Sequence, residues 1–376
     1  MSETSLAAPS PPLTLDFFYA ATGLDRQEPI RDVVRSVRGL RGHLVPLVLS
    51  VAVREGVPLG TGSEDELRRM RGRVDDYRAL AALLASAVPG ARVLKGSSLA
   101  GAYPPEVLRP SGDLDMYVPD EPALWRAVAE VFRVRPVHDV DVTVLGDGAR
   151  VHWVVVLRWP AQDPVLDIDH RIELVTFAYP GADGGPPLRA EPPRDQATAD
   201  LLAIAEEAFQ RPFTVKDLLD LAFTLGGAHR PPLPELVQAA DAYRLAPELL
   251  GLSERLRAAA HLPCPANDRL PALLSAPAAR ELAARRRGER RSRPAGPWTG
   301  PSCLAGGGPL HGLRLTPAPA HRPGAEVRFH TFPEGVLLRC PVGDFLLVAS
   351  ELVDPRGYQA AVEALQDLCA AEEAGS

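Results

Sequence analysis

The chain has 376 residues, a hydrophobic content of 46% and a formal net charge of −7. A chain of this length is too long for one small core, so two or three folded units are expected. The negative net charge argues against a general binder of nucleic acid. The most apolar stretch, residues 44–53, is too short to cross a membrane. No signal peptide is predicted, and four cysteines without a C-x-x-C pair fit reduced thiols, so a cytoplasmic location is expected.

Residues 1–62 are predicted to form a tail and a helical segment. Apolar residues recur at helical spacing from Ile30 to Ala52, and Pro46 is expected to kink or split that segment. A long helix should then start at the capping-box pair Ser63 and Glu66 and stop at 89–90. Its single apolar stripe predicts core packing and consists of Leu67, Met70, Val74, Tyr77, Leu80, Leu84 and Val88.

A glycine turn follows this helix. Leu94-Lys95-Gly96-Ser97-Ser98 is typical of a strand end, a tight turn and the start of a short helix. Backbone N–H groups at such a turn suit an anion, most often phosphate, although the same residues also occur in ordinary loops. Lys95 is notable because the only other lysine in the chain is Lys216, and the remaining basic residues are arginine.

Two carboxylates occupy alternate positions of the next predicted strand, residues 113–118. Because side chains alternate along a strand, Asp113 and Asp115 should lie on one face, a few ångströms apart. Like charges this close favour a divalent cation between them. The alternative is an exposed strand face, but the combination with the preceding glycine turn favours a site for metal ions and a polyphosphate.

The rest of a core over residues 63–180 is predicted to contain a helix capped by Asp120, a hairpin, and a strand over residues 165–175. That strand supplies a candidate third carboxylate. Asp167 is favoured because Leu166 and Ile168 flank it and indicate partial burial, and Asp169 on the same face is the alternative. The acids of this strand could equally be solvent-facing residues of an edge strand.

Three further segments are expected. Residues 195–287 should form a helical domain, in which Thr214 caps one helix and Asp217 lies in its first turn. Residues 288–309 should form an Arg/Pro/Gly-rich linker, and phosphate or RNA contact is the alternative role of the arginine run from Arg280 to Arg293. Residues 310–376 are predicted to be a small α+β domain with no visible catalytic pattern.

These motifs resemble the nucleotidyltransferase superfamily typified by DNA polymerase beta, and more narrowly its uncharacterised bacterial members. The shared hallmarks are Leu94-Lys95-Gly96, Tyr103-Pro104, Arg109 and Gly112-Asp113-Leu114-Asp115. Residues 167–171 correspond loosely to a later Asp-Leu-His-Trp-Arg stretch, with Asp169 at the usual histidine position. Residues 216–221 resemble a helix found after the core, so the resemblance covers about residues 65 to 225.

The resemblance implies an α+β fold, with a mixed sheet and helices packed against it, and transfer of NMP from an NTP, with ATP as the expected nucleotide. Mg²⁺ or Mn²⁺ would be held by Asp113, Asp115 and Asp167, and Asp167 would ligate the metal at the acceptor hydroxyl or act as general base. The triphosphate would be held by Gly96, Ser97 and Ser98, and Lys95 or Arg109 could neutralise charge on the pyrophosphate.

The acceptor is not specified by the sequence, although a small molecule or a protein side chain is expected. Long nucleic acid and membranes are not expected as partners. Two other functions stay open. One is a catalytically silent module that keeps the fold to bind a nucleotide or a partner protein. The other, less favoured, is phosphohydrolase chemistry, which usually recruits histidine ligands, and only His152 and His170 fall near the core.

Overall fold

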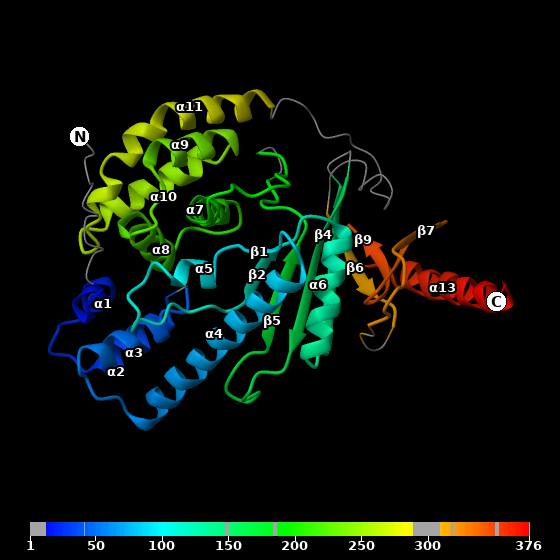
Figure 1. The fold of residues 1–376 in the computed structure, drawn as a ribbon, viewed down its shortest axis with the longest axis horizontal. Coiled ribbons are helices and arrows are strands. Elements are labelled where there is room, and N and C mark those ends of the chain that lie inside the picture. The colour runs from blue at the N-terminus through cyan, green and yellow to red at the C-terminus, as the bar shows by residue number, and fades with distance from the viewer. Residues whose placement is uncertain are drawn as a thin grey trace. The chain divides into compact units, whose positions relative to one another are not determined.

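The computed structural model describes residues 13–40, 42–146, 150–182, 186–288, 309–316, 319, 321–349 and 353–375. The chain divides into two compact units, each built from separate segments (Figure 1). The first unit comprises Met1–Ala79, Val93–Leu114 and Ala178–Ser292, and the second comprises Leu80–Arg92, Asp115–Phe177 and Arg293–Ser376. Among the described residues, no helix combines the length and apolar character needed to span a bilayer.

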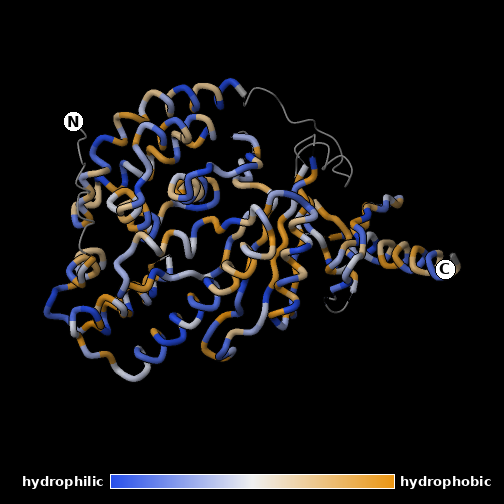
Figure 2. The backbone as a smooth tube through the Cα atoms, viewed as in Figure 1, coloured by the Kyte–Doolittle hydropathy of each residue, from blue (hydrophilic) through white to orange (hydrophobic). Residues whose placement is uncertain are grey.

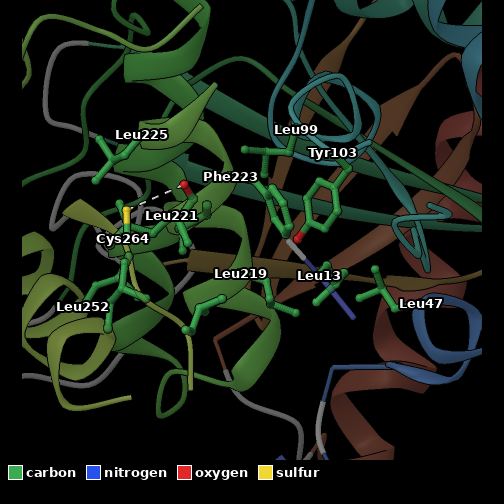
Figure 3. Close-up of a cluster of buried hydrophobic side chains, with 14 of the residues drawn as sticks. Leu13, Leu47, Leu99, Tyr103, Leu219, Leu221, Phe223, Leu225, Leu252 and Cys264 are labelled. Carbon is green, nitrogen blue, oxygen red and sulfur yellow. Dashed lines mark hydrogen bonds between the residues drawn. The ribbon is translucent and has the colours of Figure 1, made fainter. Parts of the chain in front are cut away.

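The first unit is helical. Its elements are α1 (Leu15–Thr22), α2 (Ile30–Arg38), α3 (Val45–Arg54), most of α4 (Thr61–Ala87), α5 (Ser97–Ala100), α7 (Gln196–Glu206), η1 (Glu207–Phe209), α8 (Val215–Gly226), α9 (Leu233–Ala242), α10 (Ala246–Ala258), η2 (Pro265–Asn267) and α11 (Leu270–Gly288). One hydrophobic cluster joins them, and Figure 3 shows part of it, with Leu13 between Leu47 of α3 and Leu219 of α8. Residues 1–62 and 195–287, predicted as separate parts, therefore share one core.

Local sequence signals explain several helix boundaries in this unit. The N-cap of α8 is Thr214, as the sequence predicts, and the structure adds a reciprocal capping box with Asp217. The expected split of the N-terminal helical segment is confirmed, with Pro46 in the first turn of α3, where a missing N–H costs little. The predicted start of α4 at Ser63 is wrong, because the helix already begins at Thr61.

The second unit is built on a sheet. Within the described residues its strands are β1 (Arg92–Val93), β2 (Leu114–Tyr117), β3 (Asp139–Gly146), β4 (Val151–Trp159), β5 (His170–Val175), β6 (Pro309–Arg314), β7 (Arg328–Phe332), β8 (Gly335–Cys340) and β9 (Gly343–Val348). Their order is β1-β2-β5-β4-β3-β6-β9-β8-β7. The predicted hairpin is the antiparallel pair β3–β4. A large sheet with packed helices confirms the α+β class.

The C-terminal strands extend this sheet. The sequence predicts a separate small domain over residues 310–376, but β6, which was not predicted, pairs antiparallel with β3, and β9 pairs with β6. Closing the open edge of β3 in this way satisfies its backbone hydrogen bonds. Helix α13 (Pro355–Gly375) packs on this part through Ala361, which contacts Leu337 and Leu346. The predicted linker lies, apart from its two ends, outside the described residues.

The two faces of the sheet differ. Helix α6 (Glu121–Val134), capped by Asp120 as predicted, packs on the face that carries Trp153 of β4, and its Trp125 meets that ring edge-on at 5.5 Å. Figure 2 shows hydrophobic residues running along β4. The opposite face of β2, β5, β4 and β3 carries charged side chains, which we call the charged face: Asp115, Asp139, Asp141, Arg158, Arg171 and Glu173.

Candidate functional site

The Lys95-Gly96 turn has an uncommon backbone conformation. Lys95 has φ 63°, and Gly96 has φ 57° and ψ −116°. A lysine in the left-handed region is strained, and the angles of Gly96 are readily reached only without a side chain. Two such residues in succession persist only when their surroundings hold them in place.

Helix α7 holds the first peptide of this turn. The Lys95 N–H donates to Oδ1 of Asp200 at 2.8 Å, and Asp200 is only 2% exposed. The side chain of Gln196 donates to the same oxygen at 2.9 Å and to the carbonyl of Val93 at 2.8 Å. Burial raises the pKa of Asp200 to about 6, although these hydrogen bonds oppose the rise. The end of β1 and the turn are thus fixed by one buried carboxyl group.

Helix α8 holds the other side of the turn through Arg109. The guanidinium donates through Nη1 to the Gly96 carbonyl at 2.8 Å, and through Nε and Nη2 to the two carboxylate oxygens of Asp220 at 2.6 and 2.7 Å. The Tyr103 hydroxyl donates to Asp220 at 2.7 Å, and Nζ of Lys216 lies 3.7 Å from it. This network brings together four motifs of the sequence, namely the Lys95-Gly96 turn, Tyr103, Arg109 and the helix of residues 216–221.

Burial and charge act in opposite directions on this network. The Asp220 side chain is 1% exposed, and burial by itself would raise its pKa, but the charges of Arg109 and Lys216 hold that pKa below its usual value. The pKa of Lys216 is lowered by burial and by the nearby Arg109 charge. The bidentate pair therefore stays ionised inside the protein. Because the Arg109 guanidinium is buried and bonded to Asp220 and Gly96, its geometry is that of a positioning group, which differs from the predicted contact with pyrophosphate.

The serines around the turn are not equivalent. Ser98 donates its hydroxyl to the Lys95 carbonyl at 2.7 Å and so closes the turn. The half-buried Ser97 makes no side-chain hydrogen bond to another described residue. The Lys95 side chain extends to Glu207, with which it forms an ion pair. Of the predicted phosphate-holding side chains, Ser97 is thus the one that the turn leaves available.

The segment that leads to the aspartates is also anchored in the first unit. Ser111 donates to the Asp113 carbonyl at 2.6 Å, and the Tyr77 hydroxyl of α4 donates to the Gly112 carbonyl at 3.1 Å. Tyr77 therefore adds a hydrogen bond to the core packing predicted for its stripe. A Cβ on Gly96 would lie 3.4 Å from the Ser111 hydroxyl, so the turn packs directly on this segment.

Asp113 and Asp115 keep the predicted alternation. Strand β2 starts at Leu114, and the half-buried Asp113 and Asp115 alternate with the fully buried Leu114 and Met116. Both carboxylates therefore project from the same side of the strand. The boundary between the two units falls within this motif, since one segment ends at Leu114 and the next starts at Asp115.

Glu173 is the acid that neighbours Asp115 on the charged face. The Val118 N–H donates to the Val175 carbonyl, and β2 lies next to β5 in the sheet. An antiparallel pair with this bond would place Leu114–Tyr117 beyond the end of β5, so the two strands must run parallel. In the parallel register that this bond sets, Asp115 lies beside Glu173. The burial of Ile172 and Leu174 agrees with this register.

Ion pairs cross the charged face from strand to strand. Arg158 of β4 contacts Asp139 at 2.6 Å and Asp141 at 2.7 Å, both on β3. Arg171 contacts Glu173 at 2.7 Å on the same strand. Burial would raise the pKa of Asp139, but hydrogen bonds from Arg314 and Arg158 lower it. These side chains remain partly accessible to water, so their pairing is weaker than that of Asp220.

The predicted position of Asp167 is wrong. Strand β5 starts at His170, and Asp167 lies in a turn that the Asp163 carboxylate organises by accepting from the N–H groups of Val165 and Leu166. The apolar neighbours of Asp167 are not buried, since Val165, Leu166 and Ile168 are 89%, 62% and 70% exposed. Asp169 contacts Nε2 of His138 at 3.0 Å.

The carboxylates fit a metal site in part. Two aspartates at alternate strand positions supply the oxygen ligands that Mg²⁺ prefers, and Glu173 could add a third. However, no group of three or more His, Cys, Asp or Glu side chains in the described part of the chain is arranged to hold a metal ion.

Three residues with clear roles in this region were not singled out by the sequence. Asp200 and Asp220 lie on apolar helices. A single acid in such a helix indicates a buried carboxylate with a partner, and this pattern would have identified both residues. Asp220 stood inside the motif of residues 216–221, but its link to Arg109 was not visible. Glu173 belongs to the strand predicted over residues 165–175, but it was not considered as a ligand. Choosing it requires the start of β5 and the register with β2.

In comparisons with protein-family models, with curated proteins and with solved structures, none matches this chain.

Proposed function

We propose that this protein is a metal-dependent nucleotidyltransferase that transfers NMP from an NTP, with ATP as the expected donor, to a hydroxyl of a small molecule or a protein. The observation that carries the proposal is the convergence of the motifs. Lys95-Gly96, Tyr103, Arg109 and Asp220 meet in one buried network, and the turn that they hold packs on the segment entering Asp113.

The chemistry of the parts supports this assignment. A fixed glycine turn with an available Ser97 hydroxyl suits phosphate oxygens, and Asp113 and Asp115 are suited to Mg²⁺. When bound, the metal would polarise the α-phosphate and stabilise the charge of the leaving pyrophosphate. Glu173, beside Asp115, replaces Asp167 as our candidate for the third carboxylate. The acidic chain favours a small molecule or a protein over long nucleic acid as the acceptor.

A direct test uses the purified protein with Mg²⁺, each of the four α-labelled NTPs and a lysate of the source organism as a source of acceptors. We expect label transfer that is lost in Asp113→Ala and Asp115→Ala. The matched control is Glu130→Ala, which removes a partly exposed carboxylate of α6 paired with Arg133. Transfer that survives both aspartate substitutions, or no transfer and no NTP binding at all, would refute the proposal.

The third carboxylate has its own test. We expect Glu173→Gln to lower the transfer rate at least about a hundredfold. Loss of a ligand lowers the affinity for the metal and also the stabilisation of charge that the metal provides. Asp167→Asn should stay within about threefold of the wild type, since its turn is exposed. The reverse ranking would restore Asp167 as the ligand.

A second candidate function is a catalytically silent module that binds a nucleotide or a partner protein. The bonding of Arg109 to Asp220 and to the Gly96 carbonyl, in place of the predicted contact with pyrophosphate, favours it. Metal-dependent NTP binding without transfer to any acceptor of a broad panel would select this alternative.

A further inference from the structure

The strained Lys95-Gly96 turn is held on both sides by carboxylates that are more than a hundred residues away in the sequence. Asp200 of α7 accepts the Lys95 N–H at 2.8 Å. Asp220 of α8 orients Arg109, whose Nη1 donates to the Gly96 carbonyl at 2.8 Å. We call Asp200, Asp220 and Arg109 the turn clamp. All three side chains are buried.

We propose that Asp200 and Asp220 are positioning residues of the nucleotide site, which keep the Lys95-Gly96 turn in the conformation that presents Ser97 to the phosphates. This inference rests on the proposed function. It assigns helices α7 and α8, predicted as part of a separate helical domain, to the machinery of that site. Neither carboxylate is proposed to touch the nucleotide.

The energetics of the turn give the clamp this role. A left-handed lysine followed by Gly96 at φ 57° is unfavourable without outside support. Asp200 accepts the Lys95 N–H, and Arg109 gives the Gly96 carbonyl a second donor beside the Ala100 N–H, so both peptide groups are satisfied away from water. Burial also raises the pKa of Asp200 to about 6, so an ionised carboxylate at this position costs free energy. The fold nevertheless keeps an acid at the position that bonds to the turn.

The test compares three variants with a matched control. Asp200→Ala removes the acceptor of the Lys95 N–H, while Asp200→Asn keeps an acceptor oxygen and should rescue part of the loss. The double variant Arg109→Met with Asp220→Asn removes both buried charges together, which avoids leaving one of them unpaired. The control, Asn267→Ala, breaks the buried pair of Asn267 with Ser253 in the same unit, away from the turn.

Two readouts are measured, the dissociation constant for ATP with Mg²⁺ and the hydrogen exchange of the Lys95 and Gly96 amides. We expect Asp200→Ala and the double variant to raise both the dissociation constant and the exchange rate at least about tenfold. Asn267→Ala should lower the unfolding midpoint without changing either readout.

The outcomes separate the two proposals. If the wild type binds ATP with Mg²⁺ but the clamp variants match it in affinity and in exchange, the clamp is refuted and the proposed function stands. If the wild type binds no nucleotide, the proposed function fails, and with it the nucleotide role of the clamp. Loss of affinity in Asn267→Ala equal to that in the clamp variants would also overturn the inference, since general destabilisation would then explain both.

Discussion

The turn clamp and the charged face use the same residue types in opposite ways. In the clamp, Arg109 and Asp220 are almost fully buried, bidentate and bonded to the backbone at Gly96. On the charged face, Arg158 is shared between Asp139 and Asp141, and all three are partly exposed. Removing one partner of a buried pair leaves an uncompensated charge, whereas water replaces a lost partner at the surface.

The comparison indicates how charge is divided between support and binding in this chain. Buried pairs cannot exchange a partner for a ligand without a large cost, so they are suited to fixing the backbone. Partly exposed carboxylates such as Asp115 and Glu173 can exchange a water molecule or an arginine for a metal ion at a small cost. The contrast leads to four predictions.

The largest effect is expected for Asp220→Ala. This substitution leaves Arg109 buried without its carboxylate, and we expect the free energy of unfolding to fall by about 3–5 kcal/mol. Urea unfolding of the full chain, followed by far-UV circular dichroism, would measure it. Glu130→Ala is the control on an exposed pair and should cost at most about 1 kcal/mol. Equal losses in the two variants would remove the distinction between the clamp and the surface pairs.

The next effect is a pH dependence at Asp200. Because its pKa is about 6 in the folded protein and 3.8 ordinarily, the folded state binds this proton more tightly than the unfolded chain. Its contribution is therefore most favourable at low pH and is lost as the pH rises through about 6. A gap of about two pKa units corresponds to about 3 kcal/mol.

Asp200→Asn removes this titration. We expect the stability of the variant relative to the wild type to rise by about 3 kcal/mol between about pH 4 and about pH 7, as measured by urea unfolding across that range. A difference that stays constant over the range would show that the carboxyl group does not carry the predicted shift.

A smaller effect is expected for Gly96→Ala. The added Cβ has ordinary space beside Ser111, so the cost is the strain of the backbone conformation, about 1–3 kcal/mol. Gly101→Ala is the matched control in the same short segment, because Gly101 has helical angles with φ −66° and should accept alanine with little change. Thermal unfolding compares the two. A loss in Gly101→Ala as large as in Gly96→Ala would contradict this explanation.

The smallest effect is expected on the charged face. Arg158→Gln removes the pairs with Asp139 and Asp141, and we expect a loss of at most about 1 kcal/mol that shrinks further in high salt. Unfolding at low and high ionic strength is the measurement. A loss above about 2 kcal/mol that salt does not reduce would mean that this face is as rigidly coupled as the clamp.

Much of the local structure followed from the sequence alone. The helical stripe from Leu67 to Val88 is buried except for the partly buried Met70, Thr214 caps α8, and Asp113 and Asp115 alternate with buried residues as expected. These features depend on neighbours within a few residues, through helical and strand periodicity and through capping hydrogen bonds. Local sequence is therefore enough to place the glycine turn and the aspartates on their elements.

What the tertiary structure decided depends on contacts between distant segments. The partner of Arg109 is Asp220, the partner of the Lys95 N–H is Asp200, and the neighbour of Asp115 is Glu173, none of which periodicity can identify. That Asp167 lies outside the sheet depends on where β5 begins, and β6 is recognised only by its pairing with β3. Periodicity decides which side of its own element a residue occupies, but packing alone decides what lies opposite.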